Sequence, residues 1–210
     1  MKHLDVILFV GAFAAIVPVA GFADSLTFGT DLELEVDEDD STVTLTPSLE
    51  FSSDIGVYVG ADASNVDSED DDYELSAYVG YAGEAGLFSY DLYYGRYYLN
   101  ETGDDGEEVT LTVGYPVFAG LTMATALNSD LDETETITQS FAYPLPAAYA
   151  ISGSYEFSEE DDTDSWDVGL SKVLSETVSL DWRYSDGEDD DPSVAMTVSY
   201  QTDFVELVGG

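Results

Sequence analysis

Apolar and polar residues alternate along most of this chain with a period of two. Residues 178–185 read Val-Ser-Leu-Asp-Trp-Arg-Tyr-Ser, and similar alternation runs through residues 25–34, 42–51, 165–171 and 194–201. A period of two gives a β-strand one apolar face and one polar face. Breaks in the pattern divide the chain into twelve segments of about nine to twelve residues. A tilted strand of about ten residues is long enough to cross a bilayer.

Two kinds of connection alternate between these segments. Six are acidic runs, at residues 37–40, 67–72, 101–108, 130–135, 159–164 and 186–191. Five are short, nearly uncharged breaks, at residues 53–56, 83–86, 118–120, 144–146 and 174–177. An up-and-down meander sends alternate connections to opposite ends of its sheet, so one end is strongly negative and the other is not. This asymmetry is typical of a barrel set in a membrane.

The residues on the polar face indicate which kind of β-protein this is. A soluble sandwich or lipocalin-like barrel turns its apolar face inward and exposes a charged outer face to water. Here the polar face consists mainly of Ser, Thr, Gly and Ala with a few carboxylates. Small polar side chains suit the lumen of a barrel whose apolar side contacts lipid. The pattern therefore predicts an all-β fold, an up-and-down antiparallel transmembrane β-barrel of twelve strands.

Aromatic residues form two groups along the predicted strands. One group lies beside the short breaks: Phe51, Phe118, Tyr143 and Tyr149. The other lies nearer the acidic runs: Tyr98, Tyr155, Phe157, Trp166 and Tyr184. Two such groups are typical of the aromatic girdles at the two membrane interfaces, although aromatic residues are also common in strands generally.

Three features depart from the simple alternation. Arg96 has the parity of the apolar residues, so we expect it at a membrane interface or after a β-bulge. Lys172 also has apolar parity but lies at a strand end, where its alkyl stem can extend toward water. The segment Leu121–Ser129 is only weakly amphipathic, and we expect a strand there.

The N-terminus predicts export. A small basic head (Lys2, His3) precedes an apolar stretch at residues 6–20, and small residues at 21 and 23 suit cleavage after Ala23. No later stretch is long and apolar enough for a membrane helix, so insertion requires a closed barrel. We expect a signal peptide at 1–23, an outer-membrane barrel of a Gram-negative cell at 24–204 and a short extension at 205–210. An even strand number places both termini at the short-turn, periplasmic end.

The chain is strongly acidic, with 45 Asp and Glu against 4 Lys and Arg and a formal charge of −41. Such charge normally favours disorder, but 44% of the residues are hydrophobic and the acids are concentrated in the runs. Halophilic adaptation, in which dissolved salt screens neighbouring carboxylates, explains most of the charge. A polyanion repels phosphates, so nucleic acid is excluded as a partner. The expected partners are outer-membrane lipid, small solutes and cations.

A stretch of about forty residues resembles a known family. It comprises Val57-Tyr-Val-Gly-Ala-Asp-Ala-Ser-Asn-Val-Asp67, then Tyr73-Glu-Leu-Ser-Ala-Tyr-Val-Gly-Tyr-Ala-Gly-Glu84 and Phe88-Ser-Tyr-Asp-Leu-Tyr-Tyr94. These segments are similar to the strand motifs of TorF-family porins of proteobacteria. The resemblance implies an outer-membrane barrel with a channel function, and it implies no catalytic or ligand residue. The chain departs from the family pattern at Asp62 and at Leu99-Asn100. We expect residues 64–67 to have a structural role, with Asn or Asp side chains bonding to backbone at the turn.

Several kinds of chemistry are unavailable to the chain. It has no cysteine, and its single histidine, His3, lies in the predicted signal peptide. The Ser–His chemistry of outer-membrane phospholipases is therefore excluded, and we expect no enzyme activity and no cofactor. The acidic runs at 68–72 and 186–191 offer oxygen ligands to calcium, but neither has the spacing of a specific calcium loop. No specific metal site is predicted.

The remaining candidates are charges on the polar faces of the strands. Alternation places five of them in the lumen: Glu50, Asp91, Asp167, Asp181 and Arg183. A carboxylate-lined pore favours cations over anions. Arg183, beside Asp181, is interpreted as part of a local ion pair, with a selectivity role as the alternative. The sequence thus predicts a porin for small cationic or neutral solutes. The alternative is a non-conducting structural or surface-interaction barrel, and the oligomeric state stays open.

Overall fold

A computed structural model describes residues 25–37, 41–66, 71–131, 135–158, 163–188 and 191–203. The predicted signal peptide at 1–23 and the extension at 205–210 lie outside these residues and stay predictions. Parts of five of the six acidic runs also lie outside them.

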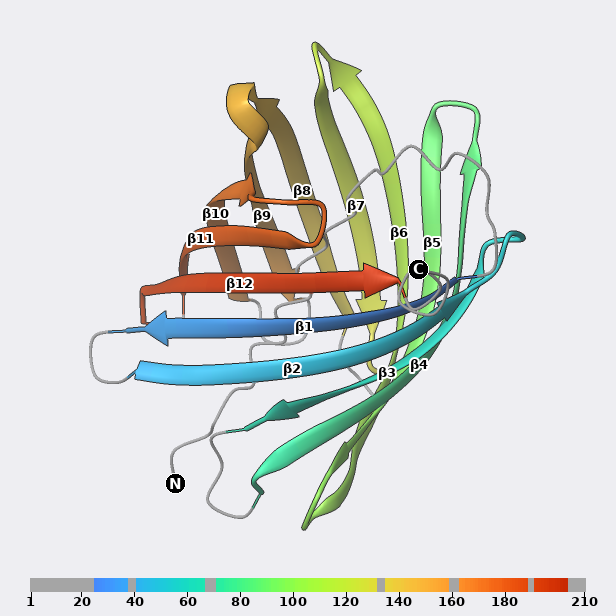
Figure 1. Cartoon of the computed structure of the whole chain (residues 1–210), viewed down its shortest axis with the longest axis vertical. Helices are drawn as coiled ribbons and strands as arrows, with labels where there is room; N and C mark the ends of the chain where they lie inside the picture. Colours follow the sequence, from blue (N-terminus) through green and yellow to red (C-terminus); the bar gives the residue numbers. More distant parts are fainter. Residues whose placement is uncertain are drawn as a thin grey trace.

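The chain forms twelve strands joined in a closed barrel (Figure 1). The strands are β1 (Ser25–Val36), β2 (Ser41–Ser52), β3 (Val57–Asn65), β4 (Tyr73–Ala85), β5 (Phe88–Leu99), β6 (Gly103–Phe118), β7 (Leu121–Ser129), β8 (Glu135–Leu145), β9 (Tyr149–Ser158), β10 (Thr163–Val173), β11 (Val178–Gly187) and β12 (Ser193–Asp203). Each pairs antiparallel with its neighbours in sequence, and β12 closes the barrel by pairing with β1. The predicted fold is confirmed, including the weakly amphipathic strand at Leu121–Ser129.

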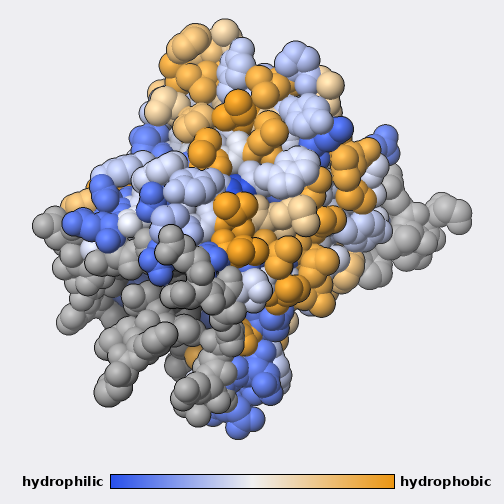
Figure 2. All heavy atoms as spheres, turned by 90° about the vertical axis from the view of Figure 1, so that its left-hand side faces the viewer, coloured by the Kyte–Doolittle hydropathy of each residue, from blue (hydrophilic) through white to orange (hydrophobic). Residues whose placement is uncertain are grey.

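The apolar face of each strand lies on the outside of the barrel. Large hydrophobic side chains along the strands are exposed, for example Leu45 at 50%, Val59 at 50% and Val194 at 52%. Figure 2 shows hydrophobic residues gathered over the middle of one side of the wall. Among the described residues, no helix is long and apolar enough to cross a membrane.

Two connections between strands are shorter in the structure than the sequence pattern suggests, because the strands extend into them. The break predicted at residues 83–86 is a tight turn at Gly86 and Leu87, because β4 continues to Ala85 and pairs with Phe88 of β5. Likewise the acidic run at 101–108 is not a loop throughout. Residues 103–108 of the run belong to β6, where Glu107 and Glu108 pair with Arg96 and Gly95 of β5.

The two basic residues with apolar parity lie on the outer face beside aromatic rings. The Arg96 guanidinium lies 5.4 Å from the centre of the Tyr98 ring, next to a bulge between Tyr97 and Tyr98. The Lys172 ammonium lies 4.7 Å from the centre of the Tyr149 ring at the short-turn end. The interfacial placement that the sequence predicts for these two residues stays a prediction.

Both predicted aromatic groups contribute exposed side chains to the outer wall. Phe51, Phe118 and Tyr143 are exposed near the short turns, and Tyr98, Tyr155, Trp166 and Tyr184 are exposed nearer the acidic ends. Trp166 and Tyr184 pack on each other across β10 and β11, with ring centres 5.5 Å apart. The wall therefore carries aromatic side chains toward both ends.

Asn65 extends the sheet where backbone pairing between β2 and β3 stops. The register between these strands runs only from Ser48 and Asp62 to Ser52 and Tyr58. Further along, the Asn65 side chain accepts a hydrogen bond from the Leu45 N–H at 2.7 Å and donates one to the Val43 carbonyl at 2.8 Å. The motif at residues 64–67 thus has a side-chain-to-backbone bond, as expected. Its partner is the neighbouring strand rather than the turn.

Candidate functional site

The inner face of the barrel is polar and rich in carboxylates. Alternation along the strands places there the five charges predicted from the sequence, Glu50, Asp91, Asp167, Asp181 and Arg183. It also places there carboxylates that were not singled out, among them Glu33, Asp62, Glu108 and Glu156. Of the basic residues that the structure describes, Arg96 and Lys172 lie on the outer face, and Arg183 lies on the inner face.

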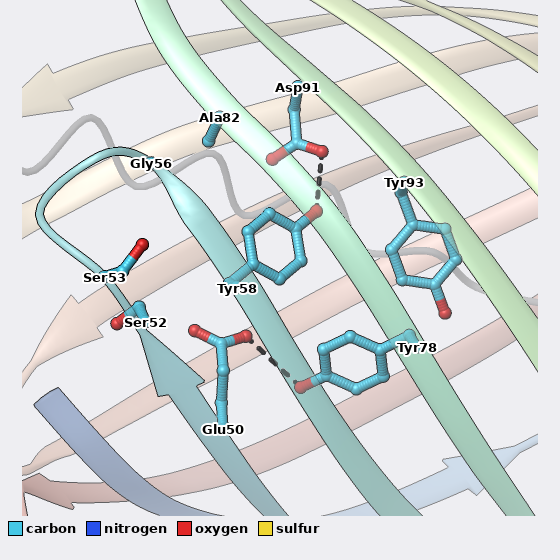
Figure 3. Close-up of a pocket in the computed structure, with 9 residues that line it drawn as sticks. All are labelled: Glu50, Ser52, Ser53, Gly56, Tyr58, Tyr78, Ala82, Asp91 and Tyr93. Atoms are coloured by element: carbon cyan, nitrogen blue, oxygen red, sulfur yellow. Dashed lines mark hydrogen bonds between the residues drawn. The ribbon is translucent and has the colours of Figure 1, made fainter. Parts of the chain in front are cut away.

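A pocket of about 440 Å³ opens on the inner wall between β2 and β5, toward the short-turn end. Its lining is drawn in Figure 3: Glu50, Ser52, Ser53, Gly56, Tyr58, Tyr78, Ala82, Asp91 and Tyr93. Two carboxylates and three aromatic rings from four neighbouring strands therefore meet at one place. They come together because the register sets β2, β3, β4 and β5 side by side.

Each pocket carboxylate is bound to a tyrosine on another strand. The Tyr58 hydroxyl donates to Asp91 Oδ1 at 2.7 Å, and the Tyr78 hydroxyl donates to Glu50 Oε2 at 3.2 Å (Figure 3). Hydrogen bonds to an ionised acceptor are stronger than those between neutral groups. The two bonds hold both rings and both carboxylates in place.

Two glycines allow the tyrosine rings to lie against the wall. A Cβ atom at Gly60 would lie 2.3 Å from Cζ of Tyr78, and one at Gly80 would lie 2.1 Å from Cζ of Tyr58. Each ring therefore crosses the backbone of a glycine on the adjacent strand. Aromatic cover of a strand glycine is a recurring device in sheets. Any other residue at these two positions would push a ring toward the lumen.

A chain of polar contacts continues from the pocket toward the acidic end. The hydroxyls of Tyr93 and Tyr97 are 3.3 Å apart, and the Tyr97 hydroxyl donates to Glu108 Oε1 at 2.6 Å. The other carboxylate oxygen of Glu108 accepts a bond from Asn128 Nδ2 at 3.0 Å. Glu108 is only 6% exposed, so these bonds compensate for the loss of water around its carboxylate.

Arg183 forms a second polar group on the opposite wall, since β10 and β11 lie about half-way around the closed strand order from β4 and β5. Its guanidinium is ion-paired with Asp167 and, through Nε at 3.3 Å, with Asp181. It also donates to the Ser152 hydroxyl at 3.1 Å, and Ser154 donates to Asp167. The local ion pair predicted between Arg183 and Asp181 is present. Asp167 is a further partner that sequence spacing did not indicate.

The inner wall of the pocket offers carboxylate oxygens and aromatic ring faces. Among the described residues, no group of three or more His, Cys, Asp or Glu side chains is arranged to hold a metal ion. The acidic runs considered for calcium lie partly outside those residues.

Sequence reasoning missed the tyrosines of the pocket. The segment Leu87–Leu99 is so rich in tyrosine that its two faces cannot be separated by hydropathy. One usable signal was present on the neighbouring strands, where Tyr58 and Tyr78 share parity with Gly60 and Gly80. Small residues beside large ones on a polar face indicate rings that lie along the wall.

Comparison with known proteins supports the fold. No family model and no curated sequence matches the chain, so the resemblance to TorF-family porins stays a prediction. Among solved structures, the KdgM porin superimposes with a TM-score of 0.68 at 12% identity, over 82% of this chain and 98% of that one. KdgM porin in complex with disordered oligogalacturonate gives 0.65 at 12% identity, over 83% and 98%.

A more distant structure has the same architecture. The Acinetobacter baumannii outer membrane protein Omp33 gives a TM-score of 0.51 at 9% identity, over 87% of this chain and 100% of that one. Identities this low bear on the fold and not on the solute. The chain has the closed β-barrel fold of outer-membrane porins.

Proposed function

We propose that this protein is an outer-membrane channel for passive diffusion of small solutes, with a preference for cationic and neutral ones. The observation that carries the proposal is the charge of the inner face. Carboxylates from β1, β2, β3, β5, β6, β9, β10 and β11 face the lumen, with Arg183 as the basic side chain described there.

The charge of the lumen makes it attractive to cations. Low-dielectric walls focus the field of fixed carboxylates and raise the local concentration of counterions. The guanidinium of Arg183 is already paired with Asp167 and Asp181, so its positive charge is offset locally. An anionic chain such as the oligogalacturonate named with the KdgM porin would be repelled by this lumen.

The outer surface supports the same placement in a membrane. Exposed hydrophobic side chains cover the wall, with aromatic residues toward both ends. The even strand number places the ends of the described barrel, Ser25 and Asp203, at the short-turn end. In bacterial outer membranes that end is periplasmic, and the acidic connections then face outward. We attribute the acidity of those connections mainly to adaptation to high salt. The thermal stability of the refolded barrel should therefore rise with KCl concentration.

Conductance of the refolded full chain in a planar lipid bilayer tests the channel. In a KCl gradient we expect single-channel events and a reversal potential displaced toward the equilibrium potential of K⁺. Asp181→Asn removes one lumen carboxylate and should reduce that displacement. Asp186→Asn is the matched control, because Asp186 lies on the outer face beside Tyr184 and should leave selectivity unchanged.

Two results would contradict the proposal in different ways. Anion preference would contradict the electrostatic argument. A complete absence of events from folded protein would instead favour the alternative, a non-conducting structural or surface-interaction barrel.

A further inference from the structure

We propose that the pocket lined by Glu50, Tyr58, Tyr78, Asp91 and Tyr93 is a binding site for small organic cations with a quaternary ammonium head group. The inference rests on the proposed function, because a solute reaches this pocket through the lumen. The inference goes beyond the channel proposal because it names a chemical class of solute and a site where such a solute binds during its passage through the lumen.

The arrangement of the rings is the first argument. The Tyr58 and Tyr78 rings are 6.2 Å apart at an interplanar angle of 63°, so they form two adjoining walls rather than one flat surface. Tyr93 continues the second wall, with its ring 5.6 Å from that of Tyr78 at 30°. Quaternary ammonium groups are recognised by several aromatic rings around one position, through the negative potential of the ring faces.

The hydrogen bonds of the pocket are the second argument. Every hydroxyl of the lining residues already has a partner: Tyr58 with Asp91, Tyr78 with Glu50, Tyr93 with Tyr97, Ser52 with Ser25, and Ser53 with the Val57 carbonyl. The pocket thus offers carboxylate charge and ring faces. A sugar needs donors as well as acceptors, whereas a quaternary ammonium ion needs only negative charge and apolar contact. The donor pattern favours the cation over a sugar.

The construction of the wall is the third argument. Gly60 and Gly80 leave space for the rings of Tyr78 and Tyr58, and the pocket volume of about 440 Å³ falls within the range of small-molecule sites. The rings are therefore set back against the wall, and they line the pocket together with Glu50 and Asp91 (Figure 3). Binding here would be weak enough to permit release, as a diffusion pathway requires.

Choline is the probe for this site, and 3,3-dimethylbutan-1-ol is its uncharged analogue of nearly the same shape. Isothermal titration of the detergent-solubilised full chain should show saturable choline binding and at least about fivefold weaker binding of the alcohol. Choline added to a bilayer in KCl should reduce K⁺ current in a saturable manner. Equal affinity for both compounds, or no saturable choline binding, would overturn the proposal.

Four variants locate the site. Glu50→Gln and Asp91→Asn should each weaken choline binding several-fold by removing charge. Gly80→Ala keeps every polar group but displaces the Tyr58 ring, and it should also weaken binding. Glu156→Gln is the matched control, because Glu156 is a lumen carboxylate on β9 bound by Thr138 and lies outside the pocket. If Glu156→Gln weakens choline binding as much as Glu50→Gln does, the site is a diffuse effect of lumen charge and the proposal fails.

The two readouts separate this inference from the channel proposal. Cation-selective conductance without an effect of choline overturns the binding site and leaves the channel. Choline binding by titration in a barrel that conducts no K⁺ overturns the channel and leaves the pocket. Loss of binding in Gly80→Ala counts only if circular dichroism and the heat-modified gel mobility of the barrel match those of the wild type.

Discussion

The carboxylate of Asp71 accepts two hydrogen bonds from Thr102, one from its backbone N–H at 3.1 Å and one from its hydroxyl at 3.0 Å. The same carboxylate accepts the Glu101 N–H at 2.7 Å. In the opposite direction, the Asn100 side-chain oxygen accepts the N–H groups of Asp72 and Tyr73 at 2.8 and 3.0 Å. The connection before β4 and the connection after β5 thus hold each other through reciprocal side-chain-to-backbone bonds. Asn100 is one of the positions where the chain departs from the TorF-family pattern.

Removing the Asp71 carboxylate should loosen this pair of connections. In Asp71→Ala, three hydrogen bonds to residues 101 and 102 are lost, so we expect cleavage after Glu101 by a Glu-specific protease to be several-fold faster in the refolded barrel. Asp72→Asn is the control, because only the backbone N–H of Asp72 takes part in the contact. Equal cleavage rates in Asp71→Ala and the wild type would show that the contact does not hold the connection.

The same contact should respond to pH with a defined sign. Burial by itself raises the pKa of Asp71, but hydrogen bonds from the backbone N–H groups of Glu101 and Thr102 and from the Thr102 hydroxyl outweigh it and lower the pKa below its ordinary value of 3.8. A group with a lowered folded pKa contributes stability that is fully present above the ordinary value and is lost as pH falls through the folded value.

Hydrogen exchange at residues 101 and 102 measures this effect. Corrected for intrinsic rates, protection of these amides should stay constant from neutral pH down to the ordinary pKa and fall at lower pH. Asp71→Asn should abolish that fall, since asparagine does not titrate. A constant protection in the wild type through the whole acid range would contradict the assignment.

The bridge made by Asn65 predicts a second stability effect. Asn65→Ala loses both bonds to β2 and should lower the free energy of unfolding by about 1–2 kcal/mol. Asn65→Asp should cost at least as much, because a carboxylate oxygen then faces the Val43 carbonyl. Urea unfolding in detergent measures both, with Ser64→Ala as the control. If Asn65→Asp is as stable as the wild type, the amide is not acting as a donor to β2.

The ion pair between Arg183 and Asp167 predicts that substitutions of these two residues have non-additive effects on stability. Side-chain exposure is 19% for Arg183 and 7% for Asp167, so Arg183→Gln leaves a nearly buried carboxylate without its counter-charge. We expect the free energy of unfolding to fall by about 3 kcal/mol, the lower end for a broken buried pair, and cation selectivity to rise. Adding Asp167→Asn to Arg183→Gln should recover most of the lost stability. Additive losses in the double variant would mean that the two side chains do not interact.

The sequence by itself determined the strands, their number and the sidedness of most of them. Residues such as Leu180 and Trp182 face outward while Ser179 and Asp181 face inward, because alternation is a local property of an extended chain. Interruptions of the alternation similarly located the short turns to within a few residues. Where both faces carry tyrosine, as at Leu87–Leu99, the local signal disappears and the faces cannot be read.

The tertiary structure decided which inward side chains are neighbours. Tyr58 and Asp91 are 33 residues apart, and Arg183 and Ser152 are 31 apart, yet each pair is hydrogen-bonded. Such contacts depend on the register of several successive strand pairs and on the pairing of β12 with β1. Alternation within a single strand encodes neither. The sequence therefore predicted an acidic lumen, whereas only the folded barrel placed two of its carboxylates among three tyrosine rings.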